Sequence, residues 1–182
     1  YYIFITTTGG LYRYDINDVI RVTGRYNNTP QIVFLRKGRG MTNITGEKVS
    51  VNQVITVIQN AAQKTGTVAS HFKAEADTEK SRYVLRVEFS SAVSDDAQRQ
   101  FLQQADEEMK AINIEYKAKR ESMRLKSPVL HVMKEGWYER GRRQQVESGM
   151  RAFQAKTQLL SPDKIVTQMI QSEIAAIVEL ED

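Results

Sequence analysis

An acidic and a basic side chain near the N-terminus have the chemistry that a nucleotide site needs. Asp18 directly precedes an apolar stretch, and its two carboxylate oxygens could chelate a pair of ligand hydroxyls. Lys48 follows Gly46 in a predicted turn that leads into a helix, where its ammonium could contact a phosphate. Together they predict a site for the ribose and phosphate of a nucleotide. Spacing alone also allows an Asx turn for Asp18 and a solvated position for Lys48.

Short strands and tight turns must position these side chains. The predicted strands are Ile3–Thr7, Val19–Thr23 and Gln31–Leu35. The predicted turns between them are Gly9-Gly10, Asp15-Ile16-Asn17 and Asn27-Asn28 with Pro30. Tyr14 and Arg36 lie in the same region and are expected to support the nucleotide. Residues 1–43 are therefore expected to form β-hairpins.

The remainder of the chain, residues 44–182, alternates between helical and strand patterns. The predicted helices are Ser50–Gly66, Ser94 to about Met123, Gly136–Ser148 and Lys164 to about Leu180. The predicted strands are Val68–Ala76, Tyr83–Phe89 and Val129–Met133. The fold class is therefore α+β, a small mixed sheet with packed helices, preceded by the β-hairpins.

Apolar residues at helical spacing define the buried faces of the first two helices. They are Val51, Val54, Ile55, Ile58 and Ala62 in the first, and Phe101, Leu102, Ala105, Met109, Ile112 and Tyr116 in the second. Tyr116 and Arg120 are one helical turn apart, so we expect the arginine stem to cover the tyrosine ring on the surface. His71 and His131 lack partners at metal-site spacing and receive no role.

Composition restricts the class of protein. The 182 residues are 41% hydrophobic and 26% charged, an ordinary globular composition without a membrane span or signal peptide. There is no cysteine, which excludes disulfides and a cysteine nucleophile and favours the cytoplasm. The net charge of +4 and basic clusters without interleaved aromatics argue against nucleic acid. Because the chain begins in the middle of a predicted strand, we expect it to be a fragment.

Five segments resemble, in order, motifs of the GH3 family of acyl-acid amido synthetases, which belongs to the adenylate-forming superfamily. They are GGLYRYDINDVIRVTG (residues 9–24), TGEKVS (45–50), NIEYKAKR (113–120), PVLHVMKEG (128–136) and GMRAFQAKTQL (149–159). Any one of them would be a weak signal, but five in compatible order over nearly the whole chain are a strong one.

The resemblance implies a role for particular residues. Asp18 would bind the ribose hydroxyls, Lys48 would contact the nucleotide phosphate, and Lys156 would be the late catalytic lysine that assists adenylation. ATP and Mg²⁺ are the implied cofactors, with no metal ligands from this chain. In the position of the family's Pro-Arg this sequence has Gln158-Leu159, which would hold Lys156 less tightly.

The resemblance also implies a division of the chain. Residues 1–43 would be the last hairpins of a large adenylating domain, and residues 44–182 a mobile C-terminal lid. The partners would be ATP or AMP, a carboxylic acid, an amino acid and the missing N-terminal domain, and the chain alone is expected to be inactive. Two alternatives stay open: the lid of an enzyme that makes thioesters, and a non-catalytic interaction domain.

Overall fold

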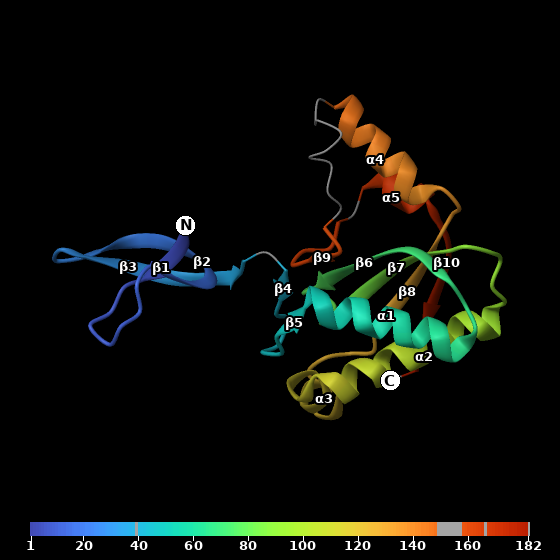
Figure 1. Cartoon of the computed structure of the whole chain (residues 1–182), viewed down its shortest axis with the longest axis horizontal. Coiled ribbons are helices and arrows are strands. Elements are labelled where there is room, and N and C mark those ends of the chain that lie inside the picture. The colour runs from blue at the N-terminus through green and yellow to red at the C-terminus, as the bar shows by residue number, and fades with distance from the viewer. Residues whose placement is uncertain (39, 149–157, 166, 182) are drawn as a thin grey trace.

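The computed structural model describes the whole chain except residues 39, 149–157, 166 and 182, and only the backbone of residues 36 and 37. It has two parts (Figure 1): a three-stranded antiparallel sheet from the N-terminal residues projects from a larger α+β domain. The α+β class predicted from the sequence is confirmed.

The N-terminal sheet has the strand order β1-β2-β3, with β1 at Tyr2–Ile5, β2 at Tyr14–Tyr26 and β3 at Thr29–Lys37. The predicted hairpin between β2 and β3 is present. The prediction that residues 15–17 form a turn before the strand was wrong, because β2 already begins at Tyr14. A local irregularity replaces the turn: Asn17 has a φ of 57°, which asparagine tolerates better than most residues.

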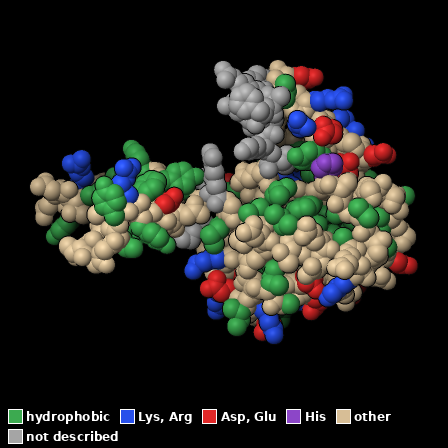
Figure 2. Space-filling view, in the orientation of Figure 1, with side chains coloured by type: hydrophobic (Ala, Val, Ile, Leu, Met, Phe, Trp, Pro, Cys, Tyr) green, Lys and Arg blue, Asp and Glu red, His purple; other side chains and the backbone are tan. Residues whose placement is uncertain are grey.

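This sheet exposes large apolar side chains, since nothing in the described chain covers it. Figure 2 shows hydrophobic side chains spread over its visible face. The exposed apolar residues of its strands are Tyr2, Phe4, Tyr14, Val22, Tyr26, Ile32, Val33, Phe34 and Leu35. Large apolar side chains exposed in this number are typical of a contact face.

The larger domain is built on a five-stranded sheet of order β10-β8-β7-β6-β9. Its strands are β6 (Ala69–Asp77), β7 (Arg82–Phe89), β8 (Val129–Met133), β9 (Leu160–Ser161) and β10 (Ile174–Glu179). The pairs β6–β7 and β8–β10 are antiparallel, whereas β7–β8 and β6–β9 are parallel, so the predicted mixed sheet is confirmed.

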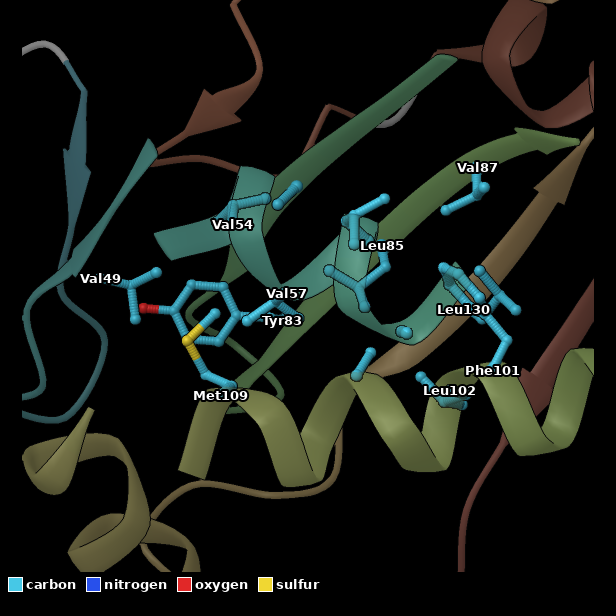
Figure 3. Packing of buried hydrophobic residues seen from close by; sticks show 14 of the residues in the cluster. Val49, Val54, Val57, Tyr83, Leu85, Val87, Phe101, Leu102, Met109 and Leu130 are labelled. Carbon is cyan, nitrogen blue, oxygen red and sulfur yellow. The ribbon is translucent and has the colours of Figure 1, made fainter. Parts of the chain in front are cut away.

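Helices α1 (Val51–Thr65) and α2 (Asp95–Ile112) pack on one face of this sheet and enclose the core. Ser50 caps α1 in a capping box with Gln53, and Gly66 ends the helix with a φ of 66°. Figure 3 shows apolar side chains from α1, α2, β7 and β8 packed between the layers. The labelled ones from the helices are Val54, Val57, Phe101, Leu102 and Met109.

The long second helix that the sequence predicted is broken. Asn113 ends α2 and caps α3 (Ile114–Glu121), its side-chain oxygen accepting a hydrogen bond from the Tyr116 amide. An extended φ and ψ at this residue turn the chain. Ile112, expected in the core, is exposed as a result.

The C-terminal segment departs most from the sequence-based expectation. A single helix was predicted from Lys164 to about Leu180, but the structure has a short helix α5 (Gln168–Ser172) followed by strand β10. Residues 174–179 alternate between half-buried and exposed positions, the period of a strand rather than of a helix. In Figure 1, α5 and α4 (Trp137–Glu147) lie on the side of the sheet away from α1 and α2.

Candidate nucleotide site

Asp18, the predicted ribose ligand, lies in β2 opposite Lys37 of β3 and is half-buried. Two short hydrogen bonds hold the backbone beside it. The Asn17 amide donates to the Asp15 carboxylate at 2.7 Å, and the Gly38 amide donates to the Asn17 carbonyl at 2.7 Å. The backbone directly before Asp18 is thus held by Asp15 on one side and by the end of β3 on the other.

Gly38 lies tightly against two side chains of the N-terminal sheet. A Cβ there would lie 2.1 Å from Asn17 Oδ1 and 2.9 Å from a ring carbon of Tyr2. Both distances are below van der Waals contact, so a larger residue would force the side chains of Asn17 and Tyr2 to move. The sequence Lys37-Gly38 therefore contributes directly to the surroundings of Asp18.

Lys48, the predicted phosphate contact, is exposed at the end of the loop of residues 43–48. This loop joins β4 (Met41–Thr42) to β5 (Val49–Ser50), which pair antiparallel directly before α1. Lys48 therefore lies where the sequence placed it, in a turn leading into a helix.

Glu47 organises the loop from inside. It is fully buried, and its carboxylate accepts hydrogen bonds from the amides of Ile44 and Thr45, each at 2.9 Å, and from the Thr45 hydroxyl at 2.9 Å. Gly46, with a φ of 115°, allows the chain to turn over this carboxylate. This role of Glu47 was not predicted, although a glutamate between Gly46 and Lys48 is visible in the sequence.

Tyr83 of β7 connects the loop to the core. Its hydroxyl donates to Glu47 Oε1 at 2.7 Å and lies 3.1 Å from the Thr42 hydroxyl. In Figure 3 the Tyr83 hydroxyl points toward Val49, past the edge of the core. Burial and the negative charge of Glu47 hold the pKa of Tyr83 well above its usual value, so it stays a donor at any physiological pH.

The segment resembling the third motif supports the same loop. Asn113 Nδ2 donates to the Lys48 carbonyl at 2.9 Å while its Oδ1 caps α3. The side chain of Asn113 therefore joins the backbone of Lys48 to the start of α3. This role was not predicted, although an N-cap asparagine three residues before Tyr116 was visible in the sequence.

Tyr116 and Arg120 are not the surface pair that was predicted. The Tyr116 hydroxyl donates to Asp106 Oδ1 at 2.6 Å, and Arg120 Nε donates to the same oxygen at 3.2 Å. Tyr116 is buried because α3 folds back on α2, and burial raises its pKa well above the usual value. This pair meets on a buried carboxylate that holds α3 in place.

The other predicted site residues have mixed outcomes. Tyr14 is exposed and pairs with Ile5. Only the backbone of Arg36 is described, opposite Val19, and Lys156 lies outside the described residues. Their proposed roles, like those of Asp18 and Lys48, stay predictions.

The described residues also bear on two other kinds of site. No three potential metal ligands come together in this part of the chain. Among its helices, none combines the length and apolar character needed to cross a membrane.

Comparison with known proteins adds a second line of evidence. Residues 52–165 match the family model of the GH3 C-terminal domain, and residues 1–37 match that of the GH3 central domain. The chain belongs to the GH3 family. The two matches lie on either side of the segment that holds the Lys48 loop, and the predicted domain boundary at residue 43 stays a prediction.

Relatives of this GH3 chain include two named ligases from Arabidopsis thaliana. It is 35% identical over 81 residues to indole-3-acetic acid-amido synthetase GH3.4, an alignment that covers 43% of this chain and 14% of that protein. It is 31% identical over 77 residues to 4-substituted benzoates-glutamate ligase GH3.12, covering 41% and 13%. The matched part of this chain thus spans about a seventh of the length of either relative.

A solved structure shares the fold. The GH3.15 acyl acid amido synthetase superimposes with a TM-score of 0.61 and 20% identity, over 94% of this chain and 33% of that one. A second structure of that enzyme, in complex with 2,4-DB, gives the same TM-score.

Proposed function

We propose that this chain is the C-terminal portion of an ATP-dependent acyl-acid amido synthetase of the cytoplasm. In this reaction ATP and a carboxylic acid give an acyl-adenylate and pyrophosphate, and the amine of an amino acid then displaces AMP to form the amide. Adenylation replaces hydroxide, a poor leaving group, by AMP. The named ligases among its relatives and the family membership support this proposal.

The observation that carries the proposal is the construction of the Lys48 loop. A buried glutamate, a core tyrosine and an α3 cap hold its backbone, yet the lysine side chain at its end is exposed. A structural surface lysine needs no such support. A lysine that must contact a phosphate needs this support, because an ammonium held in the wrong place makes a weaker electrostatic contact.

Asp18 and Lys48 belong to different parts of the structure. Asp18 lies in the projecting sheet, whereas Lys48 is fixed to the larger domain. In our proposal, Asp18 binds the ribose hydroxyls, and Lys48 approaches the phosphates when the larger domain closes over the nucleotide. Lys156 would stabilise the charge that develops as pyrophosphate leaves. Mg²⁺, when bound with ATP, would neutralise phosphate charge, held by the phosphates and by residues outside this chain.

The test is ATP–pyrophosphate exchange in a protein that includes the preceding large domain. Lys48→Ala and Lys156→Ala are each expected to lower exchange by about 100-fold, the effect of losing one electrostatic contact to the transition state. Lys64→Ala is the matched control, since Lys64 is an exposed lysine on α1 paired with Glu108, and should leave exchange within about 2-fold. Unchanged exchange in the Lys48 and Lys156 variants would overturn the roles assigned here.

Product analysis of the same protein distinguishes the acceptor. Formation of an amide with an amino acid supports the amido synthetase. Formation of a thioester with coenzyme A or a carrier thiol would favour an enzyme that makes thioesters instead. Titration of AMP into the 182-residue chain, beside Asp18→Ala, measures whether the ribose site is already present in this part of the protein.

A further inference from the structure

Helix α3 lies along the loop of residues 43–48, the Lys48 loop, and contacts it at two places (Figure 1). Near the start of the helix, Asn113 Nδ2 donates to the Lys48 carbonyl at 2.9 Å. Near its end, the half-buried side chain of Lys119 reaches Gly46, and its Cε and Nζ each lie 3.2 Å from the position that a Cβ on Gly46 would occupy. The ammonium of Lys119 therefore lies on the open side of an exposed glycine, in the same loop as Lys48.

Ion pairing within α3 does not explain the position of this ammonium. Glu115 is four residues before Lys119, the spacing at which a glutamate and a lysine pair best on a helix. No ion pair joins these two side chains in the described part of the chain. Lys117 shows the ordinary arrangement, because its Nζ lies 3.8 Å from Glu121 Oε1, one turn further along the helix. Lys119 instead extends to Gly46.

The end of α3 does not need this ammonium either. A lysine in the last turn of a helix often donates to the last free carbonyls. Here the Lys119 carbonyl accepts from the amides of Arg124 and Leu125, each at 3.1 Å, and the Ala118 carbonyl accepts from the Ser122 amide at 3.1 Å. The backbone at the end of the helix is thus satisfied by other amides, which leaves the Lys119 ammonium available to a ligand.

The negative charge of the Lys48 loop is turned away from this surface. Glu47 is the one acidic residue of the loop. Its carboxylate is fully buried and accepts hydrogen bonds from loop amides and from the Tyr83 hydroxyl. Among the residues that the structure describes, neither Lys48 nor Lys119 has a carboxylate partner. The loop and the helix beside it therefore present two ammonium groups without a neighbouring anion.

The fold keeps both lysines on one short stretch of surface. Arg120 holds this end of α3, since its Nε donates to the buried carboxylate of Asp106 at 3.2 Å. Gly46, which Lys119 contacts, and Lys48 are two residues apart, so their Cα atoms are separated by at most about 7 Å. Two cations at this spacing suit linked phosphate groups better than a single phosphate, because each ammonium acts as a separate point charge.

We propose that Lys119 is a second phosphate-binding residue of the Lys48 loop. The loop then binds the linked phosphates of ATP, or the pyrophosphate formed from them, in preference to a single phosphate. This inference rests on the function proposed above, in which Lys48 contacts the nucleotide phosphate, and it adds a cation supplied by a different element. The sequence analysis predicted no role for Lys119.

Pyrophosphate and inorganic phosphate are titrated separately into the 182-residue chain near pH 7, and the amide signals of Gly46 and Lys48 are followed by NMR. Pyrophosphate is expected to shift both signals saturably and to bind at least about tenfold more tightly than phosphate, because it contacts two ammonium groups. Lys119→Ala should weaken pyrophosphate binding at least about fivefold and bring its affinity closer to that of phosphate. Lys119→Arg keeps the positive charge and should retain most of the affinity.

Lys117→Ala is the matched control, since it removes one positive charge from the same helix at a lysine that lies near Glu121. It should change pyrophosphate binding by less than about twofold. The inference is overturned if Lys117→Ala and Lys119→Ala have equal effects, because overall charge would then account for binding. It is also overturned if the Gly46 amide does not respond, or if phosphate binds as tightly as pyrophosphate.

ATP–pyrophosphate exchange separates this inference from the proposed function. In the protein that includes the preceding large domain, Lys119→Ala should raise the KM for ATP at least about fivefold with a smaller effect on kcat, as expected for a lost binding contact. If Lys48→Ala and Lys156→Ala lower exchange but Lys119→Ala leaves KM unchanged, the inference fails and the proposed function stands. If none of the three variants changes exchange, the proposed function fails as well.

Discussion

The hydroxyl of Tyr83 donates a 2.7 Å hydrogen bond to the buried carboxylate of Glu47, joining a core strand to the loop that presents Lys48. Tyr83→Phe removes this donor and leaves Glu47 with fewer partners. We expect the free energy of unfolding to fall by about 1–2 kcal/mol, measured by urea denaturation. Tyr138→Phe is the control, because no hydrogen bond of the Tyr138 hydroxyl is present among the described contacts, and should change it by less than about 0.5 kcal/mol. Equal effects would contradict the importance of the Glu47 bond.

Asn113 performs two functions that one substitution separates. Asn113→Asp keeps an oxygen to cap α3 but replaces the amide donor that holds the Lys48 carbonyl at 2.9 Å. We expect α3 to stay helical while amide hydrogen exchange in residues 43–48 becomes faster, since the loop loses one attachment. Asn113→Ala should expose both α3 and the loop to exchange. Unchanged exchange of the loop in Asn113→Asp would show that Asn113 does not position Lys48.

Asp106 is the shared acceptor of Tyr116 and Arg120, and it also pairs with Lys110 at 2.8 Å. Asp106→Asn removes the negative charge at the centre of this buried contact, which is expected to cost about 3 kcal/mol of unfolding free energy. Glu107→Gln, its exposed neighbour on α2 and another partner of Lys110, should cost less than about 0.5 kcal/mol. Denaturant unfolding of the two variants in parallel provides the comparison.

His131 makes stability depend on pH in a defined direction. Its pKa is lowered from 6.5 to about 4 in the folded chain, by burial first and then by Arg86, Lys164 and Arg82 against the opposing charge of Glu75. The unfolded chain therefore binds the proton more tightly. Its contribution is fully present above pH 6.5 and is lost as the pH falls through 4, by about 3 kcal/mol at most.

The measurement is urea unfolding at pH values of about 7.5, 6 and 5. His131→Gln, whose side-chain oxygen can still accept from Arg86, should flatten the pH dependence relative to the unchanged chain. His71→Gln should retain it. A difference between His131→Gln and the unchanged chain that does not vary with pH would contradict the assignment.

Two glycines should respond oppositely to alanine. A Cβ at Gly38 would lie 2.1 Å from Asn17 Oδ1, whereas a Cβ at Gly141, within α4, meets no atom within 4 Å. Gly38→Ala is expected to destabilise the N-terminal sheet by about 1–3 kcal/mol, seen as faster amide exchange in β2 and β3. Gly141→Ala should stabilise α4 by up to about 1 kcal/mol. If Gly38→Ala leaves exchange in the sheet unchanged, the close approach to Asn17 is not required.

Much of the larger domain could be predicted, because the spacing of its apolar residues and its capping residues indicate the same helices and strands. The strands β6, β7 and β8 and the helix α1 lie within about a residue of their predicted bounds, since their patterns are long and have capping or turn residues at both ends. The helix predicted from Lys164 to about Leu180 was wrong for a physical reason. Its isoleucines and valine fit a helical face as well as an alternating strand, and pairing of β10 with β8 decided between them.

For the candidate site, the sequence predicted the position of Lys48 in a turn before a helix but not the contacts that hold this turn, and the roles of the site residues stay predictions. The turn that holds Lys48 was visible in the sequence. Its supports were not, because Tyr83 and Asn113 are distant in sequence and reach Glu47 and the Lys48 backbone only in the folded chain. The same holds for Tyr116 and Arg120. Their helical spacing was visible, whereas the carboxylate between them belongs to another helix.

The two faces of the five-stranded sheet contribute to folding in different ways. Apolar packing against α1 and α2 is tolerant of small shifts, because one methyl group can replace another as a neighbour. The opposite face does not tolerate such shifts. If residues 160–165 moved by one position along the sheet, Lys164 would lose its contact with Asp77. The Ile165 backbone would also lose its hydrogen bonds with Arg86 and Glu75. One side of the sheet thus supplies most of the driving force for collapse, and the other selects a single alignment of the covering chain.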